Sequence, residues 1–169
     1  MRIVDLFCGI GGFSEGARLC GHEICVAIDN DPELLKTHSK NHEQCEHHCV
    51  TLPEGMPDIL LHNVHIHASP PCQSLSQANR LTTTDKIHKS LKLVEWYLSY
   101  VIKHKPASWS FEQVCTPDVM NIVTNFSRLH AHVCKFTVIN CSDFCVPQDR
   151  KRLIAGSPNI IDCLLSNKK

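Results

Sequence analysis

The first thirty residues contain the feature that most constrains the fold, a strand that leads into a glycine-rich turn and then a helix. Residues 2–7 are mostly apolar, residues 8–16 read Cys-Gly-Ile-Gly-Gly-Phe-Ser-Glu-Gly, and residues 23–28 are apolar again. We expect strands at the two apolar runs and a helix over 13–20 between them. Glycine lets the backbone turn tightly and approach a ligand closely, so this order is typical of a Rossmann-type nucleotide-binding unit.

The same segment indicates what kind of ligand the turn would hold. Asp29 follows the second apolar run, 17 residues after Gly12, close to the spacing of about 20 at which an acid binds ribose hydroxyls. The glycines lack the phosphate-binding spacing G-x-G-x-x-G, and no G-x-x-x-x-G-K-[ST] motif occurs. A phosphate-free adenosine ligand is therefore favoured, and S-adenosylmethionine is the common one.

Caps and apolar spacing predict the next elements. Asp31 and Pro32 suit the start of a helix that ends near His42. No strand can be placed over 43–55, and one is expected within 57–68. A long helix follows, because apolar residues recur at spacings of four and three, namely Ile87, Leu91, Val94, Leu98 and Val101.

The alternation continues to the end of the chain. Residues 107–111 read as a buried strand, and Thr116 with Pro117 would begin a helix. The inward stripe of that helix would be Val119, Val123, Phe126 and His130. Residues 133–140 and 152–155 read as the last strands. The pattern predicts an α/β fold with a mostly parallel twisted sheet, helices on both faces and an antiparallel last strand. We expect one domain over 1–169.

Composition favours a soluble protein. The chain is 43% hydrophobic and 20% charged, which is ordinary for a globular domain. No apolar run approaches the ~20 residues needed to span a bilayer, and the N-terminus enters a strand pattern at once. We expect an intracellular protein without membrane association, in either nucleus or cytoplasm.

The eleven cysteines are scattered and irregularly spaced, which favours free thiols over disulfides. Residues 45–49, Cys-Glu-His-His-Cys, are conceivable as a zinc site. They lack a second paired arm at finger-like spacing. We therefore expect no metal ligands.

Charge is unevenly distributed although the formal net charge is zero. Residues 1–60 carry four basic and ten acidic side chains, whereas residues 80–169 carry thirteen basic and seven acidic ones. A polyanion would prefer the second half of the chain. A solvated surface with a chance asymmetry would give the same distribution.

A cysteine in a proline-stiffened loop is the first candidate for chemistry. Residues 68–74 read Ala-Ser-Pro-Pro-Cys-Gln-Ser and follow the apolar run at 62–67. Prolines fix φ and disfavour helix before them, so Cys72 would sit on a rigid bend at the carboxyl end of a strand. Open α/β sheets bind their ligands there. Taken alone, the segment fits a structural cysteine at least as well.

Two further segments carry polar groups that suit a reacting base. Glu112 ends the strand at 107–111 among apolar neighbours, where partial desolvation would suit a proton donor. Gln148, Arg150 and Arg152 alternate, so in an extended segment they share one face and can meet a base edge or a phosphate. A capping or salt-bridged glutamate and a solvated basic edge strand are the plain alternatives.

Together, these segments resemble the DNA (cytosine-5) methyltransferases in order and spacing. Residues 5–13, Asp-Leu-Phe-Cys-Gly-Ile-Gly-Gly-Phe, are similar to the cofactor motif of that family, and residues 70–73, Pro-Pro-Cys-Gln, to its catalytic loop. Residues 112–114, Glu-Gln-Val, stand where the family usually has Glu-Asn-Val. Residues 148–152 match its Gln-x-Arg-x-Arg segment, and the resemblance covers residues 1–157.

The resemblance implies a single catalytic domain that methylates DNA. Cys72 would add to C6 of a cytosine flipped out of the duplex, which makes C5 able to accept the methyl group of S-adenosylmethionine. Glu112 would hydrogen-bond to N3 of the ring, while Arg150 and Arg152 would orient the ring and support the acid. The residues implied to contact S-adenosylmethionine are Phe7, Gly9, Ile10, Gly12, Asp29 and Asn30.

The sequence also departs from the family pattern. About fifteen residues follow Ala155, so the target-recognition lobe and the last conserved segment of the family are expected to be absent. Residues 43–57 lack a clear match to the adenine-contacting aspartate of the family, a region in which Cys49 falls. Cys145 replaces a glycine usually found before Val-Pro-Gln.

Several functional readings stay open at this point. The chain is either a minimal enzyme, the catalytic half of a split enzyme whose recognition half is a second polypeptide, or a degenerate domain that binds DNA or protein without catalysis. A fold that binds S-adenosylmethionine for RNA or small-molecule methylation is the remaining alternative. The joint presence of Cys72, Glu112, Arg150 and Arg152 favours the DNA-methylating enzyme.

Overall fold

The computed structural model describes residues 1–72, 75 and 83–168. The chain forms two compact units, one built from residues 1–69 and 100–108 and the other from residues 70–99 and the chain from 109 onward. Gln73, which the resemblance places in the catalytic loop, lies outside the described residues. Within the part described, no helix combines the length and apolarity that a membrane crossing requires.

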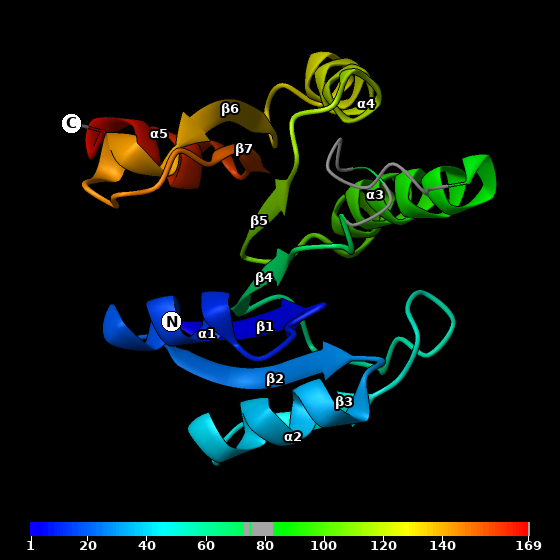
Figure 1. Cartoon of the computed structure of the whole chain (residues 1–169), viewed down its shortest axis with the longest axis vertical. Helices are drawn as coiled ribbons and strands as arrows, with labels where there is room; N and C mark the ends of the chain where they lie inside the picture. The colour runs from blue at the N-terminus through cyan, green and yellow to red at the C-terminus, as the bar shows by residue number, and fades with distance from the viewer. Residues whose placement is uncertain (73–74, 76–82, 169) are drawn as a thin grey trace. The chain divides into compact units, whose positions relative to one another are not determined.

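The first unit contains a parallel sheet (Figure 1). Its strands are β1 (Arg2–Leu6), β2 (Glu23–Asp29), β3 (Glu46–Cys49) and β4 (Val64–Ala68), in the order β3-β2-β1-β4. β1 pairs in parallel with β2 on one side and with β4 on the other, and β3 pairs in parallel with β2. β2 and β3 are added on one side of β1, whereas β4 is added on its other side. The boundary between β1 and β4 is therefore the topological switch point, where open α/β sheets bind ligands.

Two helices cover one face of this sheet. They are α1 (Gly12–Leu19) and α2 (Pro32–Asn41). Ser14 of α1 and His38 of α2 share a hydrogen bond of 3.1 Å, and Ala17 and Leu35 lie in one hydrophobic cluster with residues of β1 and β2. The Asp31 side chain caps α2 by accepting from the backbone N–H groups of Glu33 and Leu34, at 2.9 and 3.2 Å. The predicted start of this helix is thus confirmed.

The second unit has antiparallel strands. It holds most of α3 (Thr84–His104), whose residues 100–104 belong to the first unit, and most of β5 (Ser108–Gln113), whose residue 108 does too. Its other elements are α4 (Pro117–Leu129), β6 (Lys135–Asn140), the 3-10 helix η1 (Cys141–Phe144), β7 (Lys151–Gly156) and α5 (Pro158–Ser166). β7 lies between β5 and β6 and runs antiparallel to both. The Thr116 side chain caps α4, and Val119 and Val123 are fully buried, as their spacing predicts. The parallel strands and the antiparallel end of the chain confirm the predicted α/β fold class.

Three elements differ from the sequence prediction. β3 was not predicted, because its residues Glu-His-His-Cys pair with β2 alone and stay half-exposed, and such an edge strand needs no apolar alternation. The strand expected within 57–68 begins only at Val64. The helix α5, at Pro158–Ser166, follows β7 in a region for which no helix was predicted.

Cys145 shows why the family usually has a glycine at this position. The residue ends η1 with a φ of 61°, in the left-handed region. Glycine reaches this conformation freely, whereas a residue with a Cβ is strained there by about 1 kcal/mol. Cys145, which replaces the family's usual glycine, therefore holds a strained backbone conformation.

Gly11 tolerates a side chain least among the glycines of the turn. Its φ is 98°, and a Cβ there would lie 3.0 Å from His38 Cδ2 and 3.1 Å from His42 Nε2. Because the left-handed backbone resists a side chain and two rings would have to move, we expect Gly11→Ala to lower the free energy of unfolding by about 1–3 kcal/mol. Urea unfolding followed by circular dichroism measures this change.

Gly16→Ala is the matched control for that substitution. Gly16 lies inside α1, and a Cβ there would meet no atom of the described residues within 4 Å. Alanine is the better helix former, so this variant should gain about 0.5–1 kcal/mol. If Gly11→Ala and Gly16→Ala lowered the free energy of unfolding equally, the backbone conformation of the turn would not explain the effect at Gly11.

Candidate active site

One carboxylate joins the glycine turn to the end of β2. Asp29 Oδ2 accepts a hydrogen bond from Gly9 N at 2.9 Å, and Asp29 Oδ1 accepts from Asp31 N at 3.0 Å. The backbone turns through Phe7 and Gly9, whose φ values are 58° and 54°. Phe7, Gly9 and Asp29, which the sequence assigned to the cofactor, therefore lie together at the carboxyl ends of β1 and β2, with Asn30 next in the chain.

The geometry of this corner fits an adenosine ligand. A Cβ at Gly9 or at Gly12 would meet no atom of the described chain within 4 Å, so a ligand has room to approach the backbone. A carboxylate offers about four acceptor positions. Backbone N–H groups occupy one acceptor position on each Asp29 oxygen. The remaining acceptor positions suit ribose hydroxyls.

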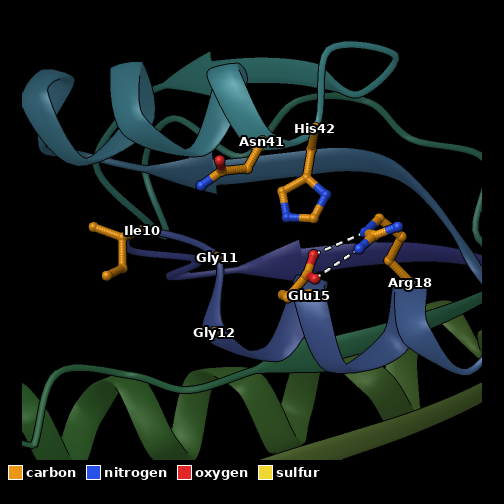
Figure 2. A pocket seen from close by; sticks show the side chains of 7 residues that line it. All are labelled: Ile10, Gly11, Gly12, Glu15, Arg18, Asn41 and His42. Atoms are coloured by element: carbon orange, nitrogen blue, oxygen red, sulfur yellow. Dashed lines mark hydrogen bonds and ion pairs between the residues drawn. The ribbon is translucent and has the colours of Figure 1, made fainter.

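A pocket of about 500 Å³ lies on another side of the turn, between α1 and the end of α2 (Figure 2). The pocket is lined by Ile10, Gly11, Gly12, Glu15, Arg18, Asn41 and His42. Arg18 is already paired with both carboxylate oxygens of Glu15, at 2.7 and 2.8 Å. The six predicted cofactor residues are thus divided, with Ile10 and Gly12 at this pocket and the others outside its lining.

A buried acid lies on β1, just before the turn. Asp5 is 1% exposed, and its Oδ2 accepts a hydrogen bond from the Ser14 hydroxyl at 2.7 Å. Burial raises the pKa of Asp5 to about 7, and the hydrogen bond from Ser14 opposes part of that rise. Asp5 belongs to the turn motif at 5–13, but its sequence position alone predicts no role for it.

A cluster of two imidazoles and a thiol lies beside that acid. The ligand atoms of His38, Cys45 and His47 all lie within 4.8 Å of one another. Burial, with the neighbouring His42 and His47, lowers the pKa of His38 to about 4. Burial also raises the pKa of Cys45 to about 12. Sequence reasoning weighed residues 45–49 for zinc and missed His38, which comes from a separate helix.

In the second unit, Glu112 of β5 and Arg152 of β7 form a close ion pair. Arg152 Nε lies 2.6 Å from Glu112 Oε1, and the side chains are 15% and 26% exposed, respectively. That nitrogen is buried and has no aligned hydrogen-bond acceptor among the described residues. The contact is therefore held by charge more than by hydrogen-bond geometry. Two of the four predicted catalytic residues are brought together here.

Gln113 ties the segment that carries Cys72 to β5. The Gln113 side chain is fully buried, and its Nε2 donates to the carbonyl oxygen of Pro70 at 3.0 Å. Its Oε1 accepts from Val114 N at 2.8 Å. Cys72 is half-buried, and its carbonyl accepts from Leu75 N at 3.0 Å. The residue next to Glu112 thus fixes the backbone two positions before the thiol, a role that the sequence did not reveal.

Arg150 and Gln148 lie outside the strand in which Arg152 sits. β7 begins at Lys151, and both Gln148 and Arg150 are exposed. Asn140 holds the segment, because its Oδ1 accepts from Arg150 N at 2.8 Å. Arg152 alone of the three lies in β7, and the expectation that the three side chains share one extended face stays a prediction. Arg150 stays at the surface without a described contact to Glu112.

Comparison with known proteins gives a family for this geometry. Residues 1–157 match the family model described as C-5 cytosine-specific DNA methylase. The type II methyltransferase M.XorII of Xanthomonas oryzae pv. oryzae is 29% identical over 167 residues. That match covers 89% of this chain and 39% of M.XorII, so the chain spans about two fifths of this relative.

Solved structures agree on the fold. A putative DNA modification methyltransferase encoded within a prophage of E. coli superposes with a TM-score of 0.68 at 20% identity, covering 96% of this chain and 48% of that chain. The N-terminal domain of human METTL16 in complex with SAH gives a TM-score of 0.60 at 16% identity, covering 92% and 60%. At these identities the likeness establishes the fold alone.

Proposed function

The chain belongs to the C-5 cytosine-specific DNA methylase family, and from this membership we propose that it transfers a methyl group from S-adenosylmethionine to C5 of cytosine in DNA. The observation that carries the proposal is the arrangement in the second unit. There the Glu112–Arg152 pair and the Cys72 segment are linked through the strand residue Gln113. Nucleophile, acid and cation are the three groups that this chemistry needs.

Cys72 is proposed as the nucleophile. C5 of cytosine is a weak nucleophile, and addition of the Cys72 thiolate to C6 converts the ring into an enamine-like species that attacks a methyl group. When bound, S-adenosylmethionine supplies that methyl group on a sulfonium. Loss of the C5 proton to a base then lets the Cys72 Sγ–C6 bond break, which restores the thiolate and the aromatic ring.

Glu112 is proposed to stabilise the ring while the sulfur is attached. A carboxylic acid at N3 donates a hydrogen bond that offsets the negative charge developing there. Because Glu112 is in an ion pair with Arg152 in the structure, a proton must reach it from solvent or with the base before it can donate. Arg152 is proposed to hold the carboxyl in place, and the exposed Arg150 to orient the base or a phosphate.

The cofactor residues are proposed from the corner described above. Asp29 would accept ribose hydroxyls, the Phe7–Gly9 backbone would pass close to the ligand, and Asn30 would lie near the adenine. Ile10 and Gly12 line the neighbouring pocket and would contact the ligand from that side. The target base has to leave the duplex, because C6 is inaccessible in a stacked pair.

Methyl transfer from labelled S-adenosylmethionine tests the proposal. We expect label in 5-methylcytosine when cytosine-containing duplex DNA is the acceptor, and none when every cytosine already carries a 5-methyl group. Nucleoside mass spectrometry identifies the product. Binding of cofactor and DNA without transfer would instead indicate the degenerate binding domain, and transfer to RNA alone would indicate a different methyltransferase.

A second polypeptide that supplies target recognition is also part of the proposal. This chain matches 39% of M.XorII. If recognition is supplied in trans, the chain alone should methylate DNA with little sequence preference. A strong preference for one short sequence by the isolated chain would contradict a recognition partner.

A further inference from the structure

We propose that His38, Cys45 and His47 form a binding site for a zinc-class divalent cation at the junction of α2 and β3. None of the three residues is among those proposed for catalysis or for cofactor binding, and all three lie in the first unit, on the helix-covered side of the sheet. His38 is fully buried, Cys45 is 7% exposed and His47 is half-buried. Their ligand atoms lie within 4.8 Å of one another.

The spacing of these atoms suits a tetrahedral ion. His38 Nδ1 and His47 Nε2 are 2.8 Å apart. Two nitrogens on one tetrahedral zinc, at 2.0–2.1 Å from the metal, are separated by about 3.3 Å. Opening the pair by about half an ångström would therefore seat the ion, and two imidazoles with a thiolate are a ligand set that zinc prefers.

A chain of hydrogen bonds from His38 through Ser14 to Asp5 orients the His38 ring so that Nδ1 faces the other ligands. Ser14 gives its one hydroxyl proton to Asp5 Oδ2 at 2.7 Å, so the Ser14 oxygen accepts from His38 Nε2 at 3.1 Å. This leaves the lone pair of His38 Nδ1 facing His47. A carboxylate or hydroxyl that fixes the second ring nitrogen is the usual support of a histidine ligand in metal sites.

A neighbouring imidazole and a route of entry lie next to the cluster. The His42 ring is 4.6 Å from the His38 ring, centre to centre. His42 Nε2 is buried and lacks a hydrogen-bond partner within the described chain. A pocket of about 260 Å³ is lined by both His42 and Cys45. A cation can thus reach the thiol from solvent, and its remaining position can take water.

This inference departs from the expectation of no metal ligands. That expectation rested on residues 45–49 alone, which lack a second arm. The fold supplies the missing arm through His38 of α2. A bound ion would clamp α2 to the half-exposed edge strand β3.

Cobalt titration of the reduced, metal-free full chain tests the site. We expect one Co²⁺ per chain, visible ligand-field bands of tetrahedral cobalt and a thiolate-to-cobalt charge-transfer band, all removed by Zn²⁺. Cys45→Ser should abolish the charge-transfer band and weaken binding by about tenfold or more. His47→Gln, at a half-buried position that a fold tolerates more easily, should weaken binding to a similar extent.

Two further variants separate this site from other thiols. Cys49→Ser, on the same strand but exposed, should change neither the band nor the affinity. Ser14→Ala should keep the charge-transfer band and weaken binding by about tenfold, because only the support of His38 is lost. Absence of saturable binding to the wild-type chain, or a charge-transfer band that survives Cys45→Ser and disappears in Cys49→Ser, would overturn the assignment.

Discussion

Replacing Cys72 by serine is expected to lower methyl transfer to DNA by on the order of a thousandfold or more, because a neutral hydroxyl adds to C6 far less readily than a thiolate. The change removes no large group from the half-buried position, so the fold should persist. DNA that carries 5-fluorocytosine gives the sharper measurement. Fluorine at C5 cannot leave as a proton, so the wild-type chain should stay covalently attached to the DNA.

Cys141→Ser is the matched control for this prediction. Cys141 is also a half-buried cysteine, at the start of η1 in the same unit. The control should form the covalent complex at the wild-type level, whereas Cys72→Ser should form none on a denaturing gel. An adduct that mass spectrometry maps to another cysteine would refute the assignment of the nucleophile, even if methylation itself is observed.

Replacing Glu112 by glutamine is expected to lower methyl transfer by about a hundredfold to a thousandfold, the range seen when one donor to a developing charge is lost. Glutamine keeps the shape but removes the charge that lies 2.6 Å from Arg152 Nε. The partly buried guanidinium would then lack its counter-charge, so the free energy of unfolding should also fall, by about 1–3 kcal/mol. Initial rates and urea unfolding measure the two effects separately.

The exposed Glu95 of α3 provides the control, since Glu95→Gln should leave both quantities unchanged. Arg152→Gln distinguishes two roles for Glu112. If Glu112 serves only as the counter-charge of Arg152, the double variant should be no slower than either single one. If Glu112 donates to the ring, Glu112→Gln should slow the reaction further in the Arg152→Gln background.

The sequence predicts most of the first unit because local signals set it. The glycine turn, the Asp31 cap and the apolar runs each act over a few residues, and the structure confirms the elements they predict. β3 escaped prediction since an edge strand can be polar throughout. The strand at 107–111 was found with Glu112 at its carboxyl end, and in the structure β5 continues to Gln113.

Side-chain partnerships across the fold were harder to predict. The pairing of Arg152 with Glu112 depends on the antiparallel register of β5 and β7, in which Glu112 is opposite Ile154. No local pattern gives that register. His38 joins Cys45 and His47 for the same reason, since the packing of α2 on the sheet decides which face of the helix meets β3.

Gln113 bears on how the segment with the nucleophile would respond to substrate. Its amide bonds the Pro70 carbonyl from a fully buried position, so swinging that segment away from β5 strands a desolvated donor at a cost of about 1–3 kcal/mol. A cost of that size would leave the displaced form at about 1–15% of the population, so the Gln113 bond biases the Pro70 backbone toward β5 without locking it there.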